Sequence, residues 1–137
     1  MAGNIHLEVV TPEKIVVSEE AQIVAAPGAL GEFGVLSGHT PFLTSLQTGI
    51  IRYTDANGKE RYVFVSGGFA EALPDKVTVL AESAERRKDI DFERAKEALA
   101  RAENRLAEDR SREDIDFNRA RAALRRATVR IRLASLS

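Results

Sequence analysis

The hydrophobic residues of the chain follow two different periods, and the change falls near Ala81. Before this point, short runs alternate apolar and polar positions, which is typical of strands that bury one face. Turn residues such as Pro27-Gly28 and Pro74-Asp75 separate the runs at hairpin spacing. This half predicts an antiparallel β-sandwich or barrel, with strands that include Ile5–Val10, Lys14–Val17, Gln22–Ala25, Ile50–Thr54, Arg61–Ser66 and Lys76–Leu80.

The second half predicts helices. It contains no proline or glycine after Glu82, and its alanine and charged residues recur with a helical period. It also contains an internal repeat, in which Asp-Ile-Asp-Phe at 89–92 recurs at 114–117 and the similarity continues along both segments. Two similar helices follow from the repeat. We therefore expect a β-sandwich domain at residues 1–84 and a two-helix domain at residues 85–137.

The repeat also predicts how the helices begin and pair. Asp91 and Asp116 can each cap a helix by accepting hydrogen bonds from free backbone N–H groups of its first turn, and Ile90 and Ile115 are placed as the apolar residues that precede the caps. The connection Ala107–Glu113 is short and polar, which favours an antiparallel hairpin. An alanine-rich seam buries little apolar area, and burial stabilises by only about 25 cal/mol per Å². We therefore expect a hairpin that can open or detach from the sandwich. The predicted stripes are Phe92, Ala95, Leu99, Ala102 and Leu106, and then Phe117, Ala120, Leu124, Ala127 and Ile131.

Charge is distributed unevenly although the net charge is only −1. Residues 1–81 hold five basic and nine acidic residues, whereas residues 82–137 hold fifteen and twelve. After Phe117 the chain has arginines but no acidic residue, so this last segment favours an anionic partner.

An arginine row on the second helix is the sharpest candidate for binding. Arg119, Arg126 and Arg130 share one helical face beside the apolar stripe, and Arg94 is placed to flank them from the first helix. Converging guanidinium groups can bind a polyphosphate bidentately, with Asp91 and Glu85 as acceptors for a base or ribose. The alternative is an ordinary solvated basic face.

Other chemistry is poorly supported. The glycine-rich segment 28–41 lacks the Lys-Ser/Thr pair and the following helix of a phosphate loop, so we expect loops there that need positive φ angles. His39 has no partner for a catalytic triad, and a chain with two histidines and no cysteine is a poor zinc ligand set. We expect no catalytic residues, no metal site and no required cofactor. Few aromatic residues and a negative first half argue against nucleic-acid binding.

Four motifs resemble the epsilon subunit of bacterial F-type (rotary) ATP synthases: Gly31–Pro41 (GEFGVLSGHTP), Ser66–Phe69 (SGGF), Val77–Ala81 (VTVLA) and the Ile-Asp-x-x-Arg-Ala motif at Ile90–Ala95. The resemblance spans nearly the whole chain. It implies a sandwich of about ten strands followed by a mobile helical hairpin. It also implies a non-catalytic central-stalk subunit that couples the gamma subunit to the c-ring, with membrane association only through the complex, at the cytoplasmic face of the bacterial inner membrane.

The same resemblance assigns individual residues. Glu32 corresponds to a position that meets the polar loops of the c-ring, and His39 to a position near gamma. The resemblance implies ATP as a regulatory ligand that holds the hairpin down, and it implies that a raised hairpin meets the catalytic alpha and beta subunits and inhibits ATP hydrolysis. A free-standing ATP sensor or a helical-hairpin interaction protein is the alternative. The positions associated with ATP are Glu85, Ile90, Asp91, Arg94, Ala95, Arg119, Arg126 and Arg130.

Overall fold

The computed structural model describes residues 3–108 and 115–136, and the chain forms two compact units, Met1–Arg87 and Lys88–Ser137. The first contains strands β1 (Ile5–Val10), β2 (Ile15–Gly28), β3 (Gly31–Leu36), β4 (Phe42–Ser45), β5 (Gly49–Asp55), β6 (Glu60–Ser66), β7 (Phe69–Ala72), β8 (Lys76–Leu80) and β9 (Ser83–Arg86). A 3-10 turn (Arg87–Asp89) joins it to α1 (Phe92–Glu108) and α2 (Ile115–Ala134) of the second unit.

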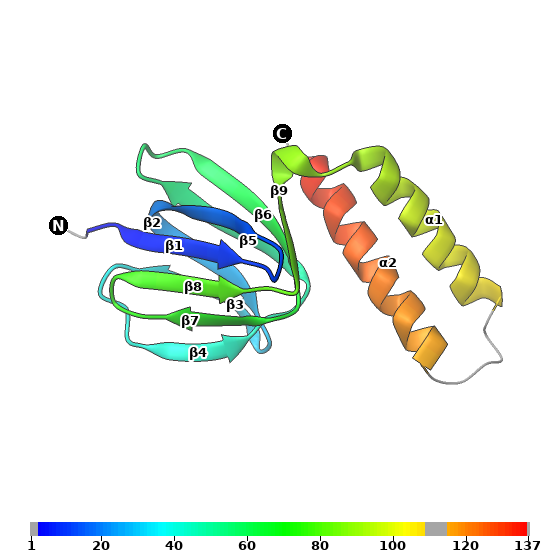
Figure 1. Ribbon diagram of the computed structural model, residues 1–137, viewed down its shortest axis with the longest axis horizontal. Coiled ribbons are helices and arrows are strands. Elements are labelled where there is room, and N and C mark those ends of the chain that lie inside the picture. Colours follow the sequence, from blue (N-terminus) through cyan, green and yellow to red (C-terminus); the bar gives the residue numbers. More distant parts are fainter. Residues whose placement is uncertain (1–2, 109–114, 137) are drawn as a thin grey trace. The chain divides into compact units, whose positions relative to one another are not determined.

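The nine strands form a β-sandwich, which confirms the predicted fold class. The strand order is β4-β7-β8-β1-β2-β5-β6-β9, and β3 pairs with β2 outside this path. The long strand β2 makes the corner: its first half pairs with β1, while Ile23–Ala25 lies between β3 and β5. Figure 1 shows the resulting layers, with β1, β8, β7 and β4 across from β2, β5 and β6.

Alternating side chains from the strands fill the space between the layers. In β1, Ile5, Leu7 and Val9 are buried and the residues between them are partly exposed, as the sequence pattern predicts. Each fully buried aliphatic side chain contributes about 1.5–3 kcal/mol. The pairing is antiparallel except between β1 and β8, which are parallel. Parallel neighbours need a long connection, and here the chain from β2 to β7 supplies it.

Several strands lie where the sequence pattern did not indicate them. The predicted strands Lys14–Val17 and Gln22–Ala25 are, apart from Lys14, parts of the single strand β2, which begins at Ile15. The glycine-rich segment that we expected to be loop contains β3, because pairing with β2 provides hydrogen-bond partners that the local sequence does not reveal. The expected positive φ angles occur at Gly31 and Gly38 within this segment.

The second unit is an antiparallel helical hairpin with an alanine seam (Figure 1). Ala95 and Ala102 of α1 and Ala120 and Ala127 of α2 are buried, whereas Phe92 of the predicted stripe is 39% exposed. The small alanine side chains permit close approach of the helices but bury little area. The predicted connection largely falls at 109–114, and this segment and the side chains of Ile115 and Asp116 lie outside the described residues.

Neither described helix combines the length and the apolar character needed to cross a lipid bilayer.

Candidate functional site

A groove between α1 and α2 gathers four arginines, which we call the groove arginines: Arg101, Arg105, Arg126 and Arg130. The groove has a volume of about 250 Å³. Its other lining residues are Ala98, Ala102, Ala120, Ala123 and Ala127. Because alanine side chains are short, they leave room between the helices above the seam.

The internal repeat explains why the groove arginines meet. Arg101 and Arg105 of the first helix occupy the same repeat positions as Arg126 and Arg130 of the second. Since the two helices are similar and pack antiparallel, the equivalent faces border the same seam. The helical spacing predicts that Arg126 and Arg130 share one face, which the groove confirms, whereas Arg101 and Arg105 were not among the predicted residues. The repeat itself contained the signal that identifies them.

The chemistry of the groove favours a multivalent anion. Each guanidinium offers five N–H donors in a planar fork that matches two oxygens of a phosphate. None of the described residues that line the groove is acidic, so four like charges gather on a neutral alanine floor. A polyphosphate would reduce the repulsion among them and could accept hydrogen bonds from several guanidinium groups at once.

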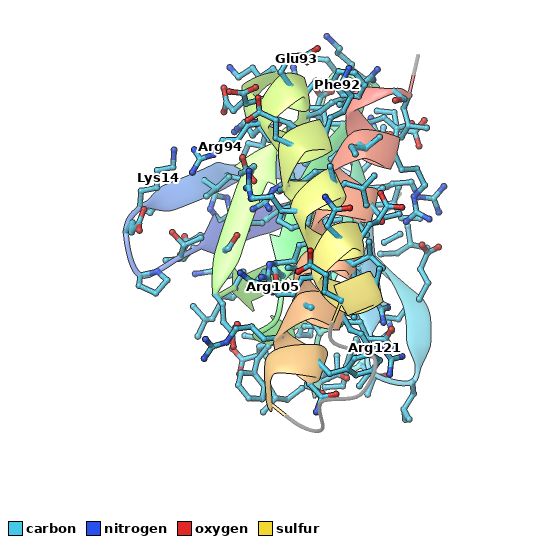
Figure 2. All side chains as sticks on the ribbon, turned by 90° about the vertical axis from the view of Figure 1, so that its right-hand side faces the viewer. Lys14, Phe92, Glu93, Arg94, Arg105 and Arg121 are labelled. Carbon is cyan, nitrogen blue, oxygen red and sulfur yellow. The ribbon has the colours of Figure 1, made fainter. Side chains whose placement is uncertain are left out.

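The residues of the Ile-Asp-x-x-Arg-Ala motif at Ile90–Ala95 lie at the start of α1, outside the groove lining. The Oδ1 atom of Asp91 accepts a hydrogen bond from the backbone N–H of Arg94 at 3.0 Å, which confirms the predicted cap. Ala95 is buried in the seam, and Ile90 is half-buried. Arg94 and Arg119 are exposed and are not among the residues that line the groove. Figure 2 looks onto the hairpin and shows Arg94 near the start of α1 and Arg105 farther along it.

Glu85 belongs to the first unit. It lies on β9, where it is paired in register with Phe64 of β6 and is half-buried. The other seven predicted ATP-associated residues belong to the second unit. Their roles in binding stay predictions.

Glu32 lies near the start of β3, and His39 follows the end of the strand. The carboxylate of Glu32 forms an ion pair with Arg52 of β5, with 2.9 Å between Oε1 and Nη2. His39 follows the strand, and its Nδ1 lies 2.6 Å from the carbonyl oxygen of Thr40. Its ring is tilted against that of Phe42, with 5.0 Å between the centroids. The roles of Glu32 and His39 as contacts to partners stay predictions.

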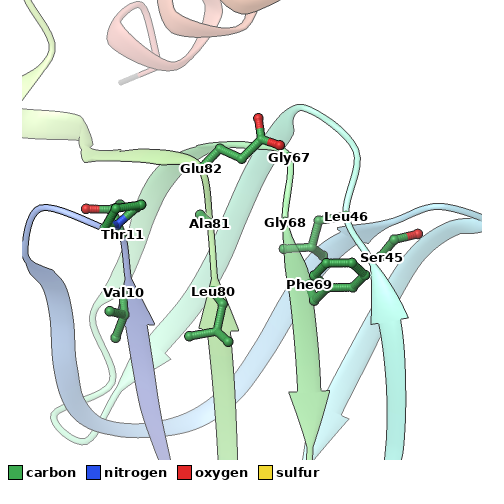
Figure 3. Close-up of a pocket in the computed structure, with 11 residues that line it drawn as sticks. Val10, Thr11, Ser45, Leu46, Gly67, Gly68, Phe69, Leu80, Ala81 and Glu82 are labelled. Atoms are coloured by element: carbon green, nitrogen blue, oxygen red, sulfur yellow. The ribbon is translucent and has the colours of Figure 1, made fainter.

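The sandwich has a hollow of its own, an apolar groove of about 680 Å³ at one end of strands β1, β8 and β7. Figure 3 shows Val10, Leu80 and Phe69 on three neighbouring strands, with Glu82 at the rim. These residues are register partners: Leu80 pairs with both Val10 and Phe69. Leu80 is 57% exposed and Phe69 is 56% exposed, so this row offers apolar surface to a partner.

Among the residues that the structure describes, no three His, Cys, Asp or Glu side chains gather as a metal-ion site.

Comparison with protein families identifies both units. Residues 4–87 match the family "ATP synthase, Delta/Epsilon chain, beta-sandwich domain". Residues 88–135 match "ATP synthase, Delta/Epsilon chain, long alpha-helix domain". Together these matches cover nearly the whole chain, and their border coincides with that of the compact units.

Similar chains and structures agree with this result. The ATP synthase epsilon chain of Desulforapulum autotrophicum is 70% identical over 108 residues, which are 79% of this chain and 80% of that one. The ATP synthase epsilon chain of Desulfatibacillum aliphaticivorans is 68% identical over 106 residues, or 77% and 75% of the two chains.

Among solved structures, a chain of the Euglena gracilis mitochondrial ATP synthase superposes with a TM-score of 0.78 at 24% identity, over 91% of this chain and 78% of that one. A chain of the Tetrahymena thermophila mitochondrial ATP synthase superposes with a TM-score of 0.57 at 12% identity, over 98% and 96%. These two likenesses show the fold. From the family matches and the bacterial relatives, the chain belongs to the ATP synthase delta/epsilon chain family as an epsilon subunit of the bacterial F-type, a non-catalytic subunit of the complex.

Proposed function

We propose that the chain works in the central stalk of the proton-translocating ATP synthase, where it couples gamma to the c-ring and restrains ATP hydrolysis through its hairpin. Family membership supports the place in the complex. The structures that share the fold come from assemblies described as F1 with a c-ring and as central stalk with c-ring. In this role the chain is peripheral to the membrane, at the cytoplasmic face of the bacterial inner membrane.

The apolar row Val10, Leu80 and Phe69 is the proposed surface for gamma. Phe69 and Leu80 lie on adjacent strands and are partly exposed. Burying them against a partner would stabilise the complex by about 25 cal/mol per Å² of apolar area. Glu32 is the proposed contact to the polar loops of the c-ring, and His39 a contact near gamma. In this proposal the apolar row binds gamma while Glu32 contacts the c-ring, so the chain links the two partners.

The hairpin is the proposed regulatory part, and the four-arginine groove is the observation that supports this most strongly. ATP supplies the polyphosphate that the groove arginines favour. Arg94 and Arg119 are proposed to contribute from the rim, with Glu85, Ile90, Asp91 and Ala95 near the nucleoside. A ligand that binds only the closed hairpin shifts a two-state equilibrium toward it.

The opposite state is the proposed brake. When the hairpin opens, the seam and the groove are lost, and α2 carries its arginines to the acidic loops of the alpha and beta subunits. Opening the hairpin requires little free energy because the alanine seam buries little apolar area. The groove arginines then bind a protein partner instead of a nucleotide.

The test is reconstitution. ATP synthase lacking this subunit is mixed with the full chain, and ATP hydrolysis and gamma binding are measured. We expect hydrolysis to fall, and we expect millimolar ATP to relieve the inhibition. The R126A/R130A variant should retain gamma binding but inhibit hydrolysis more weakly, because the same arginines bind the alpha and beta subunits, and its remaining inhibition should not respond to ATP. A chain that neither binds gamma nor slows hydrolysis would contradict the proposed function.

A further inference from the structure

We propose that Arg52 is a positioning residue, which orients the carboxylate of Glu32 for contact with hydrogen-bond donors of a polar loop on the c-ring. This inference rests on the proposed function of Glu32. It adds a residue and a mechanism, because nothing in the sequence pattern connected Arg52 with that contact.

The geometry of the pair follows from the strand register. Strand β2 lies between β3 and β5, where Glu32 is the register partner of Pro27 and Arg52 is the register partner of Ala25. Residues two apart on a strand share a face, so both charged side chains lie on the same face of the sheet. Arg52 reaches diagonally over β2, and its Nη2 lies 2.9 Å from Oε1 of Glu32.

The backbone under Glu32 is held in place. At the β2–β3 turn, the backbone N–H of Ala29 donates to Ser45 O at 2.9 Å, and the side-chain amide of Gln47 donates to Ala29 O at 2.8 Å. A Cβ at Gly28 would lie 2.9 Å from the carbonyl oxygen of Gly31, so the turn is also tightly packed. The fixed backbone determines where the Glu32 side chain begins, and the ion pair favours the side-chain conformation in which Oε1 faces Arg52.

The pair contributes little to folding. The side chains of Arg52 and Glu32 are 48% and 56% exposed, and exposed ion pairs contribute only about 0–1 kcal/mol. Its effect on a partner can be larger. A carboxylate accepts several hydrogen bonds, so Oε2 stays available while Arg52 occupies Oε1. The positive charge of Arg52 reduces the net charge of the surface, which favours neutral donors such as amides of a polar loop.

The experiment compares the binding of full-length variants to the gamma–c-ring complex and to gamma alone. We expect R52A and E32A to weaken binding to the gamma–c-ring complex about five- to tenfold and to bind gamma alone as the wild type does. The double variant should bind no more weakly than E32A, because Arg52 acts through Glu32. R52K should recover part of the affinity, since a lysine retains the charge without the planar fork.

The matched control is R61A, which removes the ion pair between Arg61 and Asp55 in the same sandwich. R61A should lower the thermal unfolding temperature but leave binding to the gamma–c-ring complex unchanged. R52A should weaken this binding but leave the unfolding temperature nearly unchanged. R52A binding like the wild type would overturn the positioning role while the coupling function stands. If the wild-type chain bound gamma alone as tightly as the gamma–c-ring complex, the inference would be overturned. If it bound neither, the proposed function would be overturned as well.

Discussion

Asp91 caps α1: its Oδ1 atom accepts a hydrogen bond from the backbone N–H of Arg94 at 3.0 Å, and its carbonyl oxygen accepts one from Ala95 at 3.0 Å. Replacing an N-cap Asp with Ala typically costs about 1 kcal/mol. We expect D91A to speed amide exchange in the first turn of α1. The matched control is D89A, which changes an exposed acid two residues earlier. If D91A and D89A showed the same amide exchange rates in the first turn of α1, the cap would not stabilise this helix.

Ala127 is 1% exposed where the two helices meet, and it also lines the groove. A127L should overpack this position and destabilise the hairpin by about 1–3 kcal/mol. A122L changes an exposed alanine of the same helix and should be nearly neutral. Thermal unfolding followed by far-UV circular dichroism compares the two. A hairpin that tolerates both leucines equally would not be packed through this seam.

Two glycines with positive φ should respond differently to alanine. Gly68 has φ of 102°, and a Cβ there would collide with the carbonyl oxygen of Leu80. Gly58 has φ of 85° but no heavy atom near its Cβ position. We expect G58A to cost about 1–2 kcal/mol from backbone strain and G68A clearly more. Chemical denaturation measures both, and equal losses would contradict the close approach.

Acid should weaken the sandwich through Asp55. The hydrogen bond from Arg61, together with the backbone N–H groups of Lys59 and Asn57, holds the pKa of this carboxyl below its ordinary value of 3.8. A group with a lowered folded-state pKa stabilises the fold above its unfolded pKa, and this contribution is lost as the pH falls through the folded value. The D55N variant should therefore lose less stability than the wild type between about pH 7 and about pH 3. Parallel losses in both would contradict the linkage.

The sequence predicts elements well where the local pattern is strong. Strand β1 alternates cleanly, and the repeated Ile-Asp-Phe segments indicate two similar helices. Strand β3 was missed because two of its six residues are glycine, and its pairing with β2 supplies the order. The parallel partnership of β1 and β8 joins distant segments, which no local period indicates.

The candidate site shows the same division. The helical spacing of Arg126 and Arg130 places them on one face, and the repeat marks Arg101 and Arg105 as their equivalents, but the packing of the hairpin brings the two pairs to one groove. Likewise, Arg52 and Glu32 are far apart in the sequence and meet across β2. Long-range pairing determines these contacts.

The most direct measurement of the regulatory claim is a calorimetric titration of the full-length chain with ATP. We expect a saturable heat within the millimolar range, because the groove arginines form charge-assisted hydrogen bonds with phosphate. The R126A/R130A variant should lose this heat, whereas R132A, which changes an exposed arginine outside the groove lining, should retain it. No saturable heat from the wild-type chain, or equal binding by R126A/R130A, would contradict a nucleotide site in the hairpin.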